Sequence, residues 1–162
     1  MLLCLLRHGI AEDPGPATGH RDAPRRLTGE GVSRMEAEAR GMKTLGIAPD
    51  VVVHSPLVRC AQTARIVAEH LGAPLREHAS ISPGADTSSV LDRVAEHPDA
   101  GVVMVCGHEP DMSRITADLT GGYVEFKKGT LAVIEIPDGR AGGGFLRALL
   151  TPRALRAAGG DA

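Results

Sequence analysis

Short apolar runs alternate along this chain with longer segments in which apolar residues recur every three or four positions. This alternation is typical of a layered domain in which parallel strands are covered by helices. The predicted parallel strands are residues 2–6, 51–53 and 102–105. Four helices are predicted: one begins after Thr28, one begins at Pro56, and two cover residues 88–96 and 111–119. The pattern therefore favours an α/β fold with a mainly parallel sheet.

The last third of the sequence has a different pattern. Two apolar runs, LAVIEI at 131–136 and FLRALL at 145–150, are joined by the glycine-rich stretch PDGRAGGG, which predicts an antiparallel hairpin at one side of the sheet. From Arg153 onward the chain is rich in Ala, Gly and Arg, and we expect these residues to be frayed. The expected fold is a single three-layer α/β/α domain over residues 1–152, with a tail at 153–162.

Length, charge and cysteine content narrow the possible classes of protein. A chain of 162 residues can bury one core without metal or disulfide staples, and its net charge of -2 disfavours a nucleic-acid binder that relies on bulk positive charge. Cys4, Cys60 and Cys106 lie in or beside apolar runs, and we expect them to be reduced core thiols. The apolar start, MLLCLL, is too short for a signal peptide or a membrane span. We expect a cytoplasmic protein with no nucleic-acid or membrane partner.

A polar cluster follows each of the three predicted parallel strands. The clusters are RHG at 7–9, HSPLVR at 54–59 and CGHEP at 106–110. Loops that leave the carboxyl ends of parallel strands line one crevice of an open sheet, so Arg7, His8, Arg59 and His108 can converge. Two guanidinium groups and two imidazoles favour a pocket for a tetrahedral oxyanion, most simply phosphate.

Other sites are less well supported by the sequence. His8, His54 and His108 could form a zinc site, yet no zinc-binding spacing is present and the neighbouring arginines would repel a cation. Ser55 lies in no G-x-S-x-G motif, which disfavours a serine hydrolase. The PDGRAGGG stretch lacks the Lys-Ser/Thr end of a P-loop. Taken alone, a histidine such as His8 at a strand end is more often a structural or surface residue, and Arg59 would be a solvated helix residue. The expected convergence of all four side chains is what favours a site.

Four motifs in fixed order carry a family resemblance. They are RHG at 7–9, RRLT at 25–28 with Gly31, SPLVRCAQT at 55–63, and GHEP at 107–110. Together they resemble the histidine phosphatase superfamily and, within it, the SixA-like phosphohistidine phosphatases, from residue 1 to about residue 152. The resemblance implies a phosphoglycerate mutase-like fold, here without a cap insertion. The sequence departs from the family pattern at Cys60, where Ala is frequent, and at His54, where a small or apolar residue is expected.

The resemblance also implies roles for individual residues. His8 matches the histidine that becomes phosphorylated, Arg7, Arg59 and His108 match the phosphate pocket, and Arg25 would add to substrate binding. No metal or organic cofactor is implied, because the cationic pocket would itself neutralise the phosphoryl charge.

The general acid is left open by the sequence. Asp86 is the best-placed carboxylate by resemblance, but it could equally be the N-cap of the following helix. Glu12 and Asp13, on the loop after His8, are further candidates, and the role of His54 is open as well.

The resemblance favours phosphohistidine on a protein as the substrate, because a pocket without a lid admits a protruding side chain. The alternatives are a phosphatase of small phosphorylated metabolites and a phosphate-binding module without turnover. A mutase is less favoured, since retaining the phosphoryl group needs a closed, water-poor site. The oligomeric state is left open.

Overall fold

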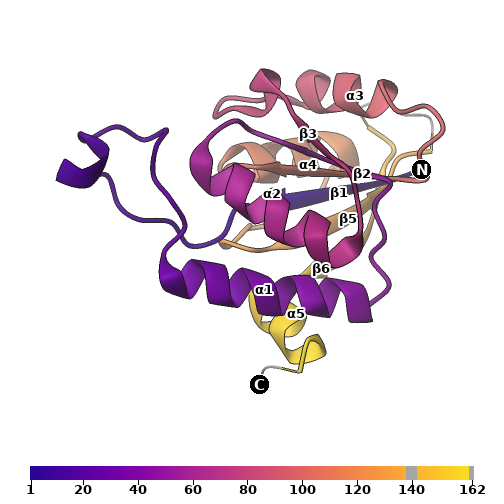
Figure 1. Cartoon of the computed structure of the whole chain (residues 1–162). Coiled ribbons are helices and arrows are strands. Elements are labelled where there is room, and N and C mark those ends of the chain that lie inside the picture. The colour runs from indigo at the N-terminus through magenta and orange to yellow at the C-terminus, as the bar shows by residue number, and fades with distance from the viewer. Residues whose placement is uncertain (138–141, 161–162) are drawn as a thin grey trace.

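The computed structural model describes residues 1–137 and 142–160, which contain a six-stranded sheet in the order β3-β2-β4-β1-β5-β6 (Figure 1). The strands are β1 (Leu2–Arg7), β2 (Val51–His54), β3 (Leu75–Glu77), β4 (Val102–Gly107), β5 (Leu131–Glu135) and β6 (Phe145–Leu150). The helices are α1 (Gly29–Thr44), α2 (Val58–Leu71), α3 (Thr87–Ala95), α4 (Asp111–Thr120) and α5 (Pro152–Ala158), with short 3-10 turns η1 (Pro16–Thr18) and η2 (Ala79–Ile81).

The predicted parallel strands are confirmed, and their order explains how the polar clusters meet. Strand β4 lies between β1 and β2 and pairs with both in parallel. Arg7 is therefore opposite Gly107, and His54 is opposite Cys106. The carboxyl ends of the three strands consequently lie side by side at one edge of the sheet.

The predicted hairpin is also confirmed, since β5 pairs antiparallel with both β1 and β6. Residues 138–141 of the predicted turn lie outside the described residues.

Two apolar clusters cover the two faces of the sheet, as a three-layer fold requires. One joins the sheet to α3 and α4 and includes Val90, Met112 and Ile115. The other joins the opposite face to α1, α2 and α5. The predicted N-cap of α1 is confirmed, because the Thr28 hydroxyl accepts a hydrogen bond from Gly31 N at 2.9 Å.

The prediction of a frayed tail from Arg153 is wrong. The chain instead forms helix α5, which is capped by Thr151 and packs on α1 through the fully buried Leu155. The side chain of Arg156 also forms an ion pair with Glu38 of α1 at 2.8 Å. A short segment rich in Ala and Gly is ordered here because a single apolar side chain and one ion pair attach it to the core.

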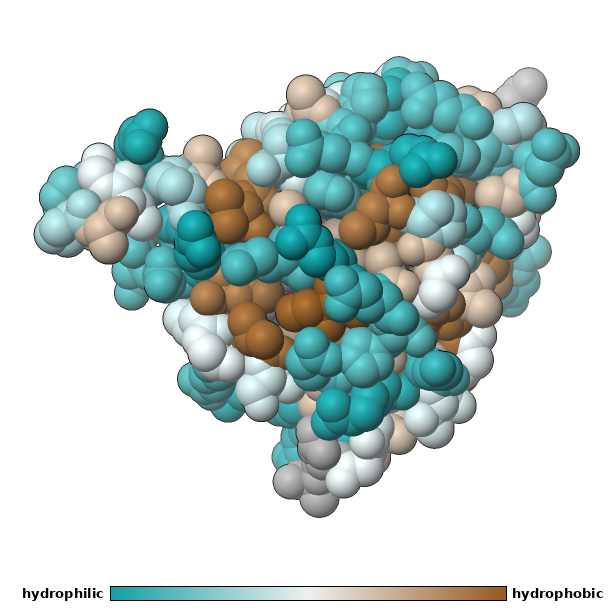
Figure 2. All heavy atoms as spheres, in the orientation of Figure 1, coloured by the Kyte–Doolittle hydropathy of each residue, from teal (hydrophilic) through white to brown (hydrophobic). Residues whose placement is uncertain are grey.

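The segment from residue 12 to residue 26, which we call the arm, projects from the body of the molecule on the side where β1 ends (Figure 1). Its base is closed by the pairing of Ala11 with Leu27 and by a hydrogen bond from Glu12 N to Arg26 O. Figure 2 shows its outer part as a mostly hydrophilic projection. No helix of the described residues is long and apolar enough to cross a membrane.

Candidate active site

The strand ends bring three of the four predicted pocket residues into direct contact. His8 follows β1, His108 follows β4, and Arg59 lies in the first turn of α2. The Arg59 guanidinium lies between the two imidazoles, with Nε donating to His8 Nε2 at 3.2 Å and an Nη nitrogen 3.3 Å from His108 Nδ1. All three residues are buried, and the two imidazole centres are 5.3 Å apart.

The contacts of His8 define its tautomer. Its Nδ1 lies 2.8 Å from the carbonyl oxygen of Gly9, which can only accept, so Nδ1 carries the proton. Nε2 accepts from Arg59 and therefore keeps a lone pair. Burial, together with the positive charges of Arg59 and Arg7 and the proximity of the second imidazole, lowers the pKa of His8 to about 3, against the opposing effect of the Gly9 hydrogen bond. His8 is thus a neutral imidazole at physiological pH, and its Nε2 lone pair can attack only when an incoming group replaces the hydrogen bond from Arg59.

His108 is oriented by side chains from two other elements. Its Nε2 lies 2.8 Å from Ser55 Oγ, after β2, and 3.6 Å from Cys60 Sγ on α2. With Nε2–H donating to Ser55, His108 Nδ1 is left to accept from Arg59. Thr63 binds the neighbouring backbone, because its hydroxyl accepts from Gly9 N at 3.0 Å and donates to Arg59 O at 2.8 Å.

Arg7, the fourth predicted residue, lies at the edge of this group. One Nη nitrogen donates to the carbonyl oxygen of Phe126, and its Nε is buried without a partner in the described part of the chain. Burial lowers the pKa of Arg7, while the charges of Glu109 and Glu125 oppose the shift. The charge of Arg7 is close enough to contribute to the lowered pKa of His8.

Asp22, on the arm, is part of the site although it was not predicted from the sequence. Its carboxylate forms an ion pair with Arg59 at 2.9 Å, and its backbone oxygen accepts from the same guanidinium at 3.1 Å. Arg25 binds the same carboxylate at 2.7 Å and also donates to the carbonyl oxygen of Glu12. Arg25 is therefore linked to Arg59 only through Asp22. Its own hydrogen bonds, to Asp22 and to the carbonyl oxygen of Glu12, lie within the arm and stabilise it.

The remaining sequence candidates have other contacts. Asp86 caps α3, and its carboxylate accepts from Ser89 N at 2.8 Å and Ser89 Oγ at 2.7 Å. These hydrogen bonds lower the pKa of Asp86, so that this exposed carboxyl is ionised at neutral pH, which is unfavourable for a general acid. Glu12 and Asp13 are exposed at the base of the arm. His54 is buried, with Nδ1 2.9 Å from its neighbour's carbonyl oxygen.

A metal centre finds no support in the geometry of the three histidines. Among residues 1–137 and 142–160, no group of three or more His, Cys, Asp or Glu side chains is arranged to hold a metal ion. Arg59 hydrogen-bonds the ring nitrogens of both His8 and His108, and its charge opposes cation binding there.

Comparison with known proteins agrees with this geometry. The family model of the histidine phosphatase superfamily (branch 1) matches residues 3–82. An uncharacterised protein of Picosynechococcus sp. strain PCC 7002 is 33% identical over 136 residues, which cover 79% of this chain and 81% of that protein.

Solved structures share the architecture over nearly the whole chain. The protein histidine phosphatase SixA in complex with tungstate superposes with a TM-score of 0.84 at 23% identity, covering 96% of this chain and 99% of that one. A putative SixA from Nakamurella multipartitia gives 0.77 at 28% identity, covering 93% and 95%. The alpha-ribazole phosphatase of Shigella flexneri gives 0.72 at 18% identity, covering 94% and 97%. This chain therefore belongs to the histidine phosphatase superfamily and is a phosphatase with a SixA-like fold.

Proposed function

We propose that the protein removes the phosphoryl group from phosphohistidine on proteins through a covalent intermediate on His8. The observation that carries this proposal is the state of His8, a buried neutral imidazole whose Nε2 lone pair faces the Arg59 guanidinium. A neutral imidazole is a nucleophile, and an adjacent guanidinium offers donors to the oxygens of an incoming phosphoryl group.

In the first step, Nε2 of His8 attacks the phosphorus in line with the bond to the leaving group. A bond from Nε2 to phosphorus forms, the phosphorus–nitrogen bond of the substrate breaks, and its electron pair stays on the substrate imidazole, which takes up a proton from solvent. Arg59 and Arg7 neutralise charge on the transferred oxygens, and His108 holds the Arg59 guanidinium in place through Nδ1.

In the second step, water attacks phosphorus on phospho-His8. Its oxygen joins the phosphoryl group, the bond to Nε2 breaks, and inorganic phosphate leaves while the neutral imidazole is restored. The Nδ1 contact with the Gly9 carbonyl holds the ring in one tautomer through both steps.

The leaving group decides how much acid catalysis is needed. A protonated imidazole leaves readily, whereas an alkoxide leaves poorly without a proton. Asp86 is an ionised helix cap, so the carboxyl group that the sequence favoured as the acid is unsuited to that role, and this suits a phosphoramidate better than an alkyl ester.

Small phosphorylated metabolites are the second candidate class of substrate. The observation that favours them is the fold shared with the alpha-ribazole phosphatase of Shigella flexneri.

One purified sample assayed against a phosphohistidine protein and a panel of phosphorylated metabolites tests the proposal. We expect the highest kcat/KM on phosphohistidine and, after acid-free quenching, phosphate bound to His8. His8→Ala should abolish both turnover and labelling, whereas His54→Ala should retain most of the activity. A higher kcat/KM on one metabolite than on phosphohistidine would overturn the proposed substrate. Turnover that survives His8→Ala would overturn the covalent route.

A further inference from the structure

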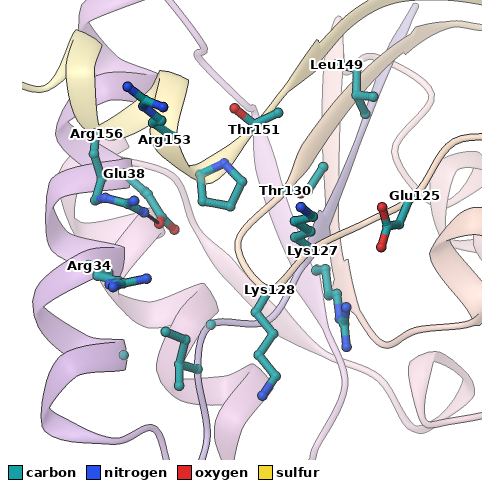
Figure 3. A pocket seen from close by; sticks show the side chains of 15 residues that line it. Arg34, Glu38, Glu125, Lys127, Lys128, Thr130, Leu149, Thr151, Arg153 and Arg156 are labelled. Carbon is teal, nitrogen blue, oxygen red and sulfur yellow. Dashed lines mark hydrogen bonds and ion pairs between the residues drawn. The ribbon is translucent and has the colours of Figure 1, made fainter.

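A cationic groove adjoins the phosphate pocket at Arg7. It is a hollow of about 920 Å³ between α1, α5, the end of β6 and the segment before β5. Figure 3 shows the charged side chains around it, from Arg34 on α1 to Arg153 and Arg156 on α5. The groove also reaches Gly9 and Ile10, the two residues that follow His8.

The charge of this groove is opposite in sign to that of the whole chain. Six basic residues and two acidic residues line it, on a chain whose net charge is -2; they are Arg7, Arg34, Lys127, Lys128, Arg153, Arg156, Glu38 and Glu125. Glu38 is already paired with Arg156. Lys127, Lys128 and Arg153 are exposed, and none of them has an acidic partner within the described residues.

The lining is not purely polar. Ile10, Leu149 and Pro152 lie among the cations, and Leu149 is 38% exposed. An inorganic polyanion would gain nothing from these apolar surfaces, whereas a polypeptide with acidic and apolar side chains would use both kinds of contact. The volume also exceeds what a single phosphate group needs and lies near the upper end for small-molecule sites.

We propose that this groove binds the polypeptide that flanks the phosphorylated histidine and selects flanks with acidic and apolar side chains. The proposal rests on the proposed function, because it requires the phosphoryl group to lie beside His8 and Arg7 while the rest of the substrate continues into the groove. Lys127, Lys128 and Arg153 would then set KM without taking part in bond breaking.

The test uses phosphohistidine peptides in matched pairs. In one peptide of each pair the residues next to the phosphohistidine are Glu and Leu, and in the other they are Gln and Leu. One pair carries these residues before the phosphohistidine and a second pair carries them after it. For the wild-type protein we expect kcat/KM to be at least about tenfold higher on the acidic peptide, because its KM is lower. A tenfold difference corresponds to about 1.4 kcal/mol of binding free energy. The double variant Lys128→Gln/Arg153→Gln should lose this preference while hydrolysing p-nitrophenyl phosphate at the wild-type rate.

A matched control removes two equally exposed charges elsewhere, in Lys43→Gln/Arg65→Gln, and should keep the preference. Binding of an acidic peptide that carries a stable phosphohistidine analogue, measured by calorimetry, gives a readout independent of turnover. Equal kcat/KM on both peptides, or a preference that survives in the groove variant, would overturn the groove assignment alone. If the protein hydrolysed p-nitrophenyl phosphate but neither peptide, the proposed function would be overturned instead. If tripolyphosphate inhibited the protein and no peptide bound, the groove would be assigned to small polyanions.

Discussion

His8 provides the most direct residue-level prediction, because its protonation state determines its reactivity. We expect its imidazole to titrate with a pKa of about 3 in the free protein, since burial and the charges of Arg59 and Arg7 oppose protonation. The ring should therefore stay neutral as the pH falls through the usual histidine range near 6.5. Nitrogen-detected NMR of the histidine side chains measures this midpoint.

The same titration supplies its own control. Tungstate or phosphate in the pocket adds negative charge, so the pKa of His8 should rise when the anion binds. Because its folded pKa is below its unfolded value, His8 should also reduce the free energy of unfolding as the pH falls from about 6.5 towards 3. A midpoint near 6.5 with no response to the anion would contradict the buried, cation-surrounded imidazole.

Arg59 should be intolerant of any substitution, because its planar guanidinium contacts His8, His108 and Asp22 at once. We expect Arg59→Ala to lose about 2 to 4 kcal/mol of transition-state stabilisation and Arg59→Lys to lose less, since a point charge replaces a fork. The measurement is kcat/KM on one substrate, with circular dichroism to verify folding. Wild-type kinetics in Arg59→Ala would show that the phosphate pocket has been misassigned.

For Asp86, we expect a cap and not a general acid. Asn is as good an N-cap as Asp, so Asp86→Asn should leave the melting temperature and kcat nearly unchanged, whereas Asp86→Ala should lower the melting temperature. Rates on an alkyl phosphate, p-nitrophenyl phosphate and phosphohistidine complete the test. A loss of about 100-fold confined to the alkyl phosphate in Asp86→Asn would restore the acid role.

Much of the site could be predicted from the sequence, because His8, Arg59 and His108 lie at or near the ends of adjacent parallel strands. Asp22 could not, since it approaches Arg59 from an arm whose path depends on tertiary contacts. The motif around Ser55 addresses only a role as a nucleophile, while its observed contact is with His108. A polar side chain that orients an imidazole carries no spacing signal of its own.

At the scale of elements, long apolar patterns predicted their strands and helices, and short segments did not. Strand β3 contains three residues with one apolar side chain, so it forms only because β2 offers an edge. Helix α5 depends in the same way on its contact with α1. Local sequence is a weak signal where a tertiary contact supplies the stabilisation.

The packing of α5 on α1 leads to an element-scale prediction at Gly41. A Cβ at this position would lie 1.8 Å from the Leu155 carbonyl oxygen, so the two helices must separate to accommodate it. We expect Gly41→Ala to lower the free energy of unfolding by about 1 to 3 kcal/mol in urea titration. Gly29→Ala in the same helix is the control, because a Cβ there meets nothing within 4 Å, and a similar loss in both variants would show that the close approach is not the cause.

At the scale of the whole molecule, the two faces of the sheet serve different purposes. The face covered by α3 and α4 is closed by apolar packing. On the other face, α5 both completes the apolar cluster through Leu155 and supplies Arg153 and Arg156 to the cationic groove. One short helix therefore links the stability of the fold to the surface beside the proposed phosphate pocket.

A chain that ends at Thr151 tests this dual role. It lacks the buried Leu155, whose loss alone is worth about 1.5 to 3 kcal/mol, and it uncovers the apolar cluster against which that side chain packs. We expect a clearly lower melting temperature in calorimetry, while the full-length Leu155→Ala protein should show a smaller loss and Arg153→Gln almost none, because Arg153 is exposed. The truncated chain should still hydrolyse p-nitrophenyl phosphate below its melting temperature, since His8, Arg59 and His108 come from other elements. If truncation left the melting temperature unchanged, α5 would contribute nothing to the core, and the tail would behave as the frayed segment that its composition alone predicts.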